Sequence, residues 1–190
     1  NDKGNTEKIE PFLRFFKEAG LPQAVCKNLS AHMSEHFIKF FPRPFDVQHL
    51  SSHDTFSCDD FALETVYCPG HTPGSVCFFD RKNGRLFSGD HFLQNITPNP
   101  VVEIENQNMD NGYKSLSSYL RSLELISTMD VKLVLPGHGS PFSSHRKRVD
   151  EIKRHHRIRR QEVLNALKSC KGGPPSWPGA SLFMISQQLF

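Results

Sequence analysis

Three short strings in the chain place a metal-binding side chain next to glycine. His71 lies in Cys-Pro-Gly-His-Thr-Pro-Gly-Ser, Asp90 in Ser-Gly-Asp-His, and His138 in Leu-Pro-Gly-His-Gly. Imidazole and carboxylate groups are ordinary ligands of zinc, iron and manganese. A neighbouring glycine lets the backbone turn sharply and project the ligand from a loop. Any one string alone could be a plain turn, but together they predict that His71, Asp90 and His138 bind metal.

Each string directly follows a segment that is typical of a β-strand. Apolar and β-branched residues predict strands over 61–67, 76–79, 86–88 and 131–135. The Asn83-Gly84 pair between the second and third of these is a strong hairpin signal. The three candidate ligands are therefore expected at strand ends.

Helices are expected on both sides of these strands in the sequence, over residues 6–19, 23–40, 113–128, 145–170 and 180–190. Thr6 is the expected N-cap of the first helix, which Gly20-Leu21-Pro22 should end. The inward side of the helix over 113–128 is expected to carry Leu116, Leu120, Leu123 and Ile126. Residues 94–112, rich in Asn and Pro, predict a long loop after Asp90, which either borders a cleft or crosses the surface.

Composition excludes some classes of protein and leaves others open. None of the apolar runs approaches the roughly 20 residues that cross a bilayer, so we expect no membrane partner. The five cysteines include no Cys-x-x-Cys pair, which favours free thiols and a reducing, cytoplasmic location. Residues 145–160 carry a net charge of +6, while the whole chain carries +3. This stretch is either a solvated helix face or a contact for nucleic acid.

The strings around His71, Asp90 and His138 resemble the C-terminal part of the metallo-β-lactamase superfamily over about residues 60–145. The resemblance implies an α/β fold, an αββα sandwich with two metal ions between its sheets. It implies that His71 is a terminal ligand of the first metal, that Asp90 bridges both metals, and that His138 is a terminal ligand of the second. Zinc is the expected metal, with iron and manganese as alternatives. His91, next to Asp90, either orients a ligand or is a plain loop histidine.

The resemblance also implies a reaction. The expected function is that of a metal-dependent hydrolase, in which metal-held hydroxide attacks the carbonyl of a small thioester, ester or lactone and Asp90 takes a proton. One alternative is a nuclease of the same fold that cleaves phosphodiesters and uses residues 145–160 to attract nucleic acid. Another is a non-catalytic module that binds nucleic acid or a partner subunit. β-Lactam hydrolysis is disfavoured by the cysteine pattern, and a homodimer stays open.

The chain departs from the family pattern in one large respect, because it lacks the string His-x-His-x-Asp-His that supplies four of the ligands. His49 and His53 have the wrong spacing, and His32 and His36 lack the adjacent Glu of a helical zinc site, so all four are expected to face solvent. We therefore expect residues upstream of Asn1 to be missing and this chain alone to be inactive, with only weak zinc binding.

The expected domains follow from this interpretation. Residues 1–145 would form a partial metallo-β-lactamase-like domain, in which 1–45 are a helical insertion or lid. Residues 146–190 would form the basic helix and the start of a winged-helix module.

Overall fold

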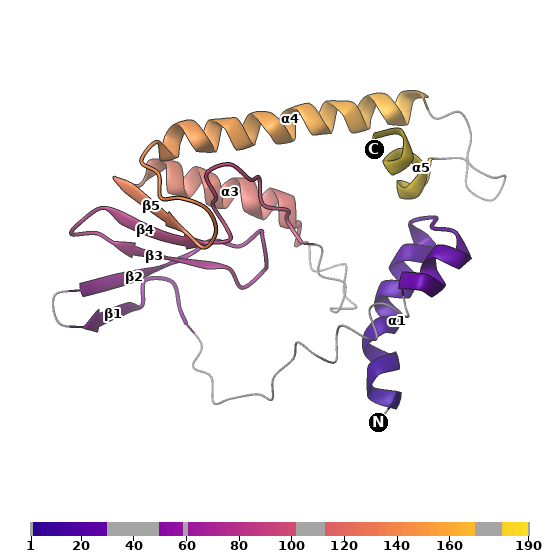
Figure 1. The fold of residues 1–190 in the computed structure, drawn as a ribbon, viewed down its shortest axis with the longest axis horizontal. Coiled ribbons are helices and arrows are strands. Elements are labelled where there is room, and N and C mark those ends of the chain that lie inside the picture. Colours follow the sequence, from indigo (N-terminus) through magenta and orange to yellow (C-terminus); the bar gives the residue numbers. More distant parts are fainter. Residues whose placement is uncertain (1, 30–49, 59–60, 102–112, 170–179, 190) are drawn as a thin grey trace. The chain divides into compact units, whose positions relative to one another are not determined.

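The computed structural model describes residues 2–29, 50–58, 61–101, 113–169 and 180–189 (Figure 1). Their contacts divide the chain into two compact units. The sheet unit comprises the described residues within Gln48–Glu103 and Met109–His155. The helical unit comprises those within Asn1–Val47 and His156–Phe190. The division falls inside one long helix, and each unit is described by itself.

The sheet unit contains one five-stranded sheet in the order β1-β2-β3-β4-β5. The strands are β1 (Thr55–Cys58), β2 (Phe61–Tyr67), β3 (Val76–Asp80), β4 (Arg85–Gly89) and β5 (Leu133–Pro136). Neighbouring strands are antiparallel from β1 to β4, whereas β4 and β5 are parallel. A parallel pair needs a crossover, and here helix α3 (Ser115–Thr128) lies between β4 and β5 in the sequence. The predicted strands are confirmed, and β1 is an additional short strand.

The hairpin predicted at Asn83-Gly84 joins β3 to β4. The Asp80 carboxylate accepts hydrogen bonds from the backbone and side-chain nitrogens of Asn83, at 3.1 and 2.7 Å. Gly84 has φ +65°, a conformation in which a side chain would be strained. The Asn-Gly pair therefore predicts this hairpin because Asn83 bonds back to Asp80 and Gly84 adopts a positive φ.

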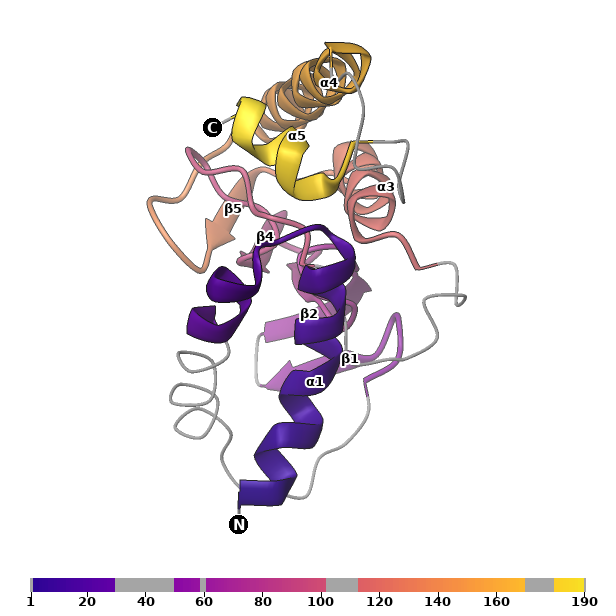
Figure 2. The same ribbon diagram turned by 90° about the vertical axis from the view of Figure 1, so that its right-hand side faces the viewer.

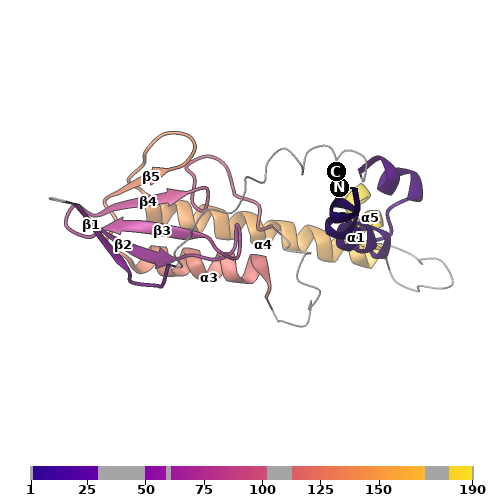
Figure 3. The same ribbon diagram turned by 90° about the horizontal axis from the view of Figure 1, so that it is seen from below.

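Helix α3 and the first part of α4 (His145–Ser169), up to His155, cover one face of the sheet and lie behind it in Figure 3. The core between these layers contains Cys77, Phe79, Leu86, Tyr119, Leu123, Ile126, Val134, Val149 and Ile152. On the other face Phe56 and Tyr67 are nearly half exposed, and the Phe56 ring meets Phe78 edge to face. The described residues of the sheet unit thus form one sheet layer and one helix layer.

One predicted feature of α3 is wrong, because Leu116 is 42% exposed. The buried residues of α3 are Ser118, Tyr119, Ser122, Leu123 and Ile126. At 100° per residue, Leu116 lies about 90° from the centre of this face. An apolar stripe alone mislocates the buried face, because that face includes two serines, one of which, Ser122, donates a hydrogen bond to the loop after β2.

The helical unit begins with α1 (Asp2–Glu18), so the prediction of Thr6 as the N-cap is wrong. The predicted stop is confirmed. The Gly20 and Leu21 amides donate to Lys17 and Phe16 carbonyls, and Gly20 has φ +87°. This is the pattern of a helix that ends in a left-handed residue.

Residues 23–29 form the second helical segment, and the rest of the predicted helix, 30–40, lies outside the described residues. Helix α5 (Leu182–Leu189) lies beside the end of α1 (Figure 2), where the Phe183 amide donates to the Ala19 carbonyl at 3.0 Å. Among the helices of the described ranges, none is long and apolar enough to cross a membrane.

Candidate metal centre

Three strand ends bring the loops of the candidate ligands to the same edge of the sheet. β2, β4 and β5 run in one direction, because β3 is antiparallel to both β2 and β4 while β5 is parallel to β4. His71 follows β2, Asp90 follows β4 and His138 follows β5. The carboxyl ends of these strands therefore share an edge, although β3 separates β2 from β4.

Asp90 and His138 are in direct contact. Gly89 of β4 is paired with Pro136 of β5, and the Gly137 amide donates to the Gly89 carbonyl at 2.8 Å. The next side chains along the two strands then meet, with His138 Nε2 3.3 Å from Asp90 Oδ1. A Cβ atom on Gly137 would lie 2.7 Å from Asp90 Oδ1, so glycine is what allows the carboxylate to occupy this place.

The loop that carries His71 is fixed against α3. A Cβ atom on Gly70 would lie 2.3 Å from Tyr119 Cα, and Gly70 has φ +145°. Ser122 Oγ donates to the Pro69 carbonyl at 2.8 Å, and the Tyr67 hydroxyl donates to the Pro73 carbonyl at 2.7 Å. These contacts hold the backbone on both sides of His71.

His71 presents one ring nitrogen in the form that binds metals. Its Nδ1 lies 2.9 Å from the Asn99 carbonyl oxygen, which can only accept a hydrogen bond. Nδ1 therefore carries the proton, and Nε2 keeps its lone pair. Metal-bound histidines ordinarily make such a hydrogen bond through the nitrogen that faces away from the metal.

His91 is buried, with 2% of its surface exposed, and its ring meets the Tyr119 ring edge to face at 5.0 Å. Burial, together with the nearby His71, lowers the pKa of His91 from 6.5 to about 4. Neither ring nitrogen has a hydrogen-bond partner within the described part of the chain. At neutral pH His91 is therefore uncharged and carries unused hydrogen-bonding capacity.

Arg148 holds the backbone that follows Asp90, and sequence reasoning missed it. Its side chain is 12% exposed, and its Nε and Nη2 donate to the Leu93 and Ile96 carbonyls at 2.9 and 3.0 Å. Nη1 donates to Glu151 on the same helix at 3.2 Å. Within a run of basic residues, the sequence does not distinguish an arginine that binds loop carbonyls from one whose charge faces solvent.

Replacing Arg148 by Met should loosen this loop. We expect the free energy of unfolding of the sheet unit to fall by about 3 kcal/mol, because two hydrogen bonds from a charged group are lost. Hydrogen exchange of the amides in 91–97 should speed up by more than that of β3. Arg154→Met, at an exposed position on the same helix, is the matched control. Equal exchange in the two variants would contradict the assigned role of Arg148.

The donors fit a divalent metal in kind but not in number. None of the groups of His, Cys, Asp and Glu in the described ranges brings three or more together closely enough to hold an ion. The side chain of His53 is 82% exposed and its Nδ1 lies 3.1 Å from Glu64, as expected for a solvent-facing residue. His32, His36 and His49 lie outside the described residues. Cys26, Cys68 and Cys77 are free thiols, as predicted for these three.

Comparison with known proteins shows the family to which this chain belongs. The model of the metallo-beta-lactamase superfamily matches residues 10–138. A Bacillus subtilis protein named as a probable metallo-hydrolase, YqjP, is 32% identical over 122 residues, which are 64% of this chain and 35% of the relative. The chicken acyl-coenzyme A thioesterase MBLAC2 is 33% identical over 102 residues, 51% of this chain and 33% of the relative.

A solved structure shares the fold. A metallo-beta-lactamase family protein of Thermus thermophilus superposes with a TM-score of 0.66 at 23% identity, covering 93% of this chain and 52% of that chain. The predicted fold class is thereby confirmed. The chain spans about a third of the length of the two curated relatives described above. Because the family model covers more than half of its residues, the chain belongs to the metallo-beta-lactamase superfamily.

Proposed function

We propose that this chain supplies His71, Asp90 and His138 as ligands in a metal-dependent hydrolase that cleaves small acyl thioesters. The observation that carries the proposal is the 3.3 Å separation of Asp90 Oδ1 and His138 Nε2 at a shared strand edge. Two ligands in a tetrahedral shell with bonds of about 2.1 Å are about 3.4 Å apart. Side chains at this spacing can therefore bind one ion together.

Each residue has a distinct role in the proposal. Asp90 follows β4, which lies between β2 and β5 in the sheet. It serves as the shared ligand, with His138 after β5 on one side of it and His71 after β2 on the other. His71 is held in the correct tautomer by the Asn99 carbonyl. His91 is proposed as a neutral positioning residue, through the packing of its buried ring against Tyr119. Bound divalent metals would supply Lewis acidity and an activated water molecule, with zinc suited to two imidazoles and a carboxylate, and iron or manganese as alternatives.

The remaining ligands are proposed to come from outside the described residues, because three donors are too few for two ions. The chain's short span relative to its relatives supports this part of the proposal. Reading the coding sequence upstream of Asn1 tests it directly. A His-x-His-x-Asp-His string there would support it, and a reading frame without one would contradict it. Weak zinc binding by the 190-residue chain alone stays a prediction, as do the winged-helix start and the homodimer.

Thioesters are favoured among the acyl substrates because the chicken relative is named an acyl-coenzyme A thioesterase. The test uses the full protein that the coding sequence defines, loaded with zinc. Asp90→Asn should lower kcat/KM for an acyl thioester at least about 100-fold and lower the bound metal per chain. Asp130→Asn, an exposed carboxylate outside the site, is the control and should change neither. Thioester hydrolysis that survives Asp90→Asn would refute the proposed role.

The basic stretch does not favour the nuclease alternative. Arg146 donates to the Ser127 and Met129 carbonyls at the end of α3, at 3.0 and 3.1 Å. Arg148 clamps the loop after Asp90, and Lys153 pairs with Glu124. Three of the eight basic side chains thus act within the sheet unit, and they are not free to form a surface for phosphates. Binding of nucleic acid by the other basic residues of 145–160 stays an untested alternative.

A further inference from the structure

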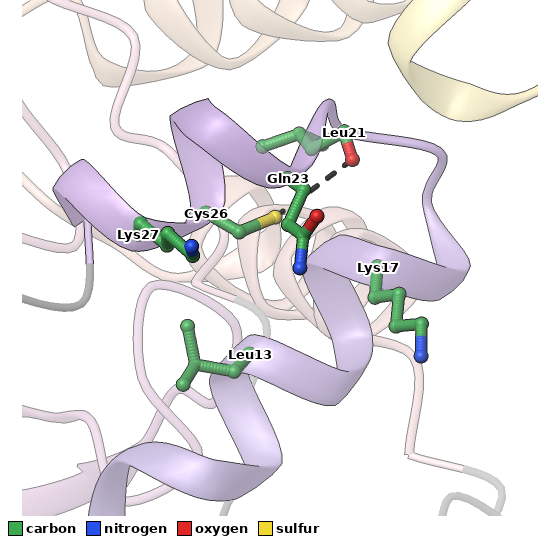
Figure 4. Close-up of a pocket in the computed structure, with 6 residues that line it drawn as sticks. All are labelled: Leu13, Lys17, Leu21, Gln23, Cys26 and Lys27. Carbon is green, nitrogen blue, oxygen red and sulfur yellow. Dashed lines mark hydrogen bonds between the residues drawn. The ribbon is translucent and has the colours of Figure 1, made fainter.

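The helical unit contains a pocket that the metal ligands do not use. Its volume is about 540 Å³, within the range of small-molecule sites. It lies between α1 and residues 23–29 (Figure 4). The pocket is lined by Leu13, Lys17, Leu21, Gln23, Cys26 and Lys27. All six belong to the helical unit.

The interior of this pocket is mainly apolar. Leu13 and Leu21 are half-buried, and each contributes a branched aliphatic side chain. The Cys26 thiol donates to the Leu21 carbonyl at 3.8 Å, so its proton is already engaged within the protein. What Cys26 presents to the pocket is then a small, polarizable, weakly polar surface. An unbranched hydrocarbon chain suits such walls, since it needs no hydrogen-bond partner.

The charged side chains of the pocket have a single sign. Lys17 and Lys27 lie on its two sides in Figure 4, and none of the six lining residues is acidic. Both lysines are exposed, and within the described ranges neither forms an ion pair with a carboxylate. Lysine can lay its aliphatic stem along an apolar wall and keep its ammonium group at the rim. The pocket therefore combines an apolar interior with a lysine on each of two sides.

We propose that this pocket binds an amphiphilic anion, an unbranched acyl or alkyl chain of about ten carbons with a carboxylate or phosphate head group. The chain would lie against Leu13, Leu21 and Cys26, and the head group would lie between Lys17 and Lys27. Charge complementarity selects an anion over an alcohol or a cation of the same length. The proposal concerns the helical unit alone, so its outcome is independent of the metal ligands and of the proposed hydrolysis.

The test titrates the 190-residue chain with decanoate and with decyl phosphate, followed by calorimetry. Either anion should bind with a Kd of about 100 µM or tighter, and the stronger of the two identifies the head group. The double variant Lys17→Gln/Lys27→Gln should bind about tenfold more weakly, since each exposed ion pair contributes little. Lys114→Gln/Lys132→Gln, which removes two exposed lysines of the sheet unit, is the matched control and should leave the Kd unchanged.

A second measurement locates the bound chain. Alkylation of Cys26 by iodoacetamide, followed by peptide mass spectrometry, should slow at least about fivefold at saturating decanoate, because the tail covers the thiol. Circular dichroism of the lysine variants verifies that they keep their helices. Any one of three results would overturn the proposal: no binding of either anion at 1 mM (about tenfold above the expected Kd), equal binding by decyltrimethylammonium, or unchanged Cys26 alkylation in the presence of a bound anion.

Discussion

Gly70→Ala is expected to lower the free energy of unfolding of the sheet unit by at least about 4 kcal/mol. The new Cβ atom would lie 2.3 Å from Tyr119 Cα and 2.5 Å from the Tyr119 nitrogen. Both are backbone atoms of α3 on the face that packs into the core, where Tyr119 itself is fully buried, so they cannot move away cheaply. Gly70 also has φ +145°, which an alanine rarely adopts. The loop after β2 must therefore move away from α3, and His71, which is the next residue, is displaced with it.

Gly74→Ala is the matched control for this prediction. Gly74 lies in the same loop, four residues further on, and a Cβ atom there would meet nothing within 4 Å. We expect a change of less than about 1 kcal/mol. Native-state hydrogen exchange of the β3 and β4 amides measures both variants, because these strands lie in the core. Similar stabilities of the two variants would show that the loop does not depend on its contact with Tyr119.

The arrangement of the site was partly predictable from sequence because each ligand is tied to local backbone chemistry. A glycine next to His71, Asp90 or His138 indicates a sharp turn at a strand end, and the strands themselves are apparent from their composition. The contact between Asp90 and His138 was not predictable in this way. It depends on β4 and β5 being parallel neighbours in a particular register, and those strands are joined by more than 40 residues of chain.

The supporting residues were hidden for a different reason. Tyr119 and Ser122 look like ordinary helix residues, and their function becomes apparent only when the backbone of the loop after β2 is placed against them. Arg148 looks like one charge among many until the Leu93 and Ile96 carbonyls are brought to it. Such residues contact backbone atoms that are distant in sequence. Every residue has a backbone carbonyl, so a sequence motif cannot indicate which carbonyl will be bound.

Acidification is expected to destabilise the sheet unit through His91. In the folded protein its pKa is lowered to about 4, chiefly because burial removes water from the imidazolium and secondly because His71 is near. In the unfolded chain the pKa returns to about 6.5. Between these values the unfolded state binds a proton that the folded state does not, so stability is complete above pH 6.5 and falls as the pH falls towards 4. The total loss is about 3 kcal/mol.

Other groups contribute outside or alongside this pH range. Burial also lowers the pKa of His145, which acts in the same direction as His91. Hydrogen bonds from Arg81 and His53 lower the pKa of Glu64, and those from Asn83 lower the pKa of Asp80. The two carboxylates remain ionised in the folded state until the pH falls below their ordinary range. The decline between pH 6.5 and 5 therefore belongs to buried histidine.

The variant His91→Leu isolates the contribution of His91, because leucine has a similar size and binds no proton. Between pH 6 and 4.5, we expect the free energy of unfolding of this variant to fall less steeply with decreasing pH than that of the unmodified protein. The slopes should differ by about one bound proton, which is about 1.4 kcal/mol per pH unit. His53→Asn removes an exposed histidine at φ +73°, a conformation that asparagine tolerates. As the control, it should lose only the lowering of the Glu64 pKa, which acts at the acid end of this pH range. An NMR titration that gave the His91 ring a pKa near 6.5 would contradict the prediction. It would mean that water reaches the ring, and a hydrated imidazole beside Asp90 would be charged in mild acid and could not serve as the neutral positioning residue proposed here.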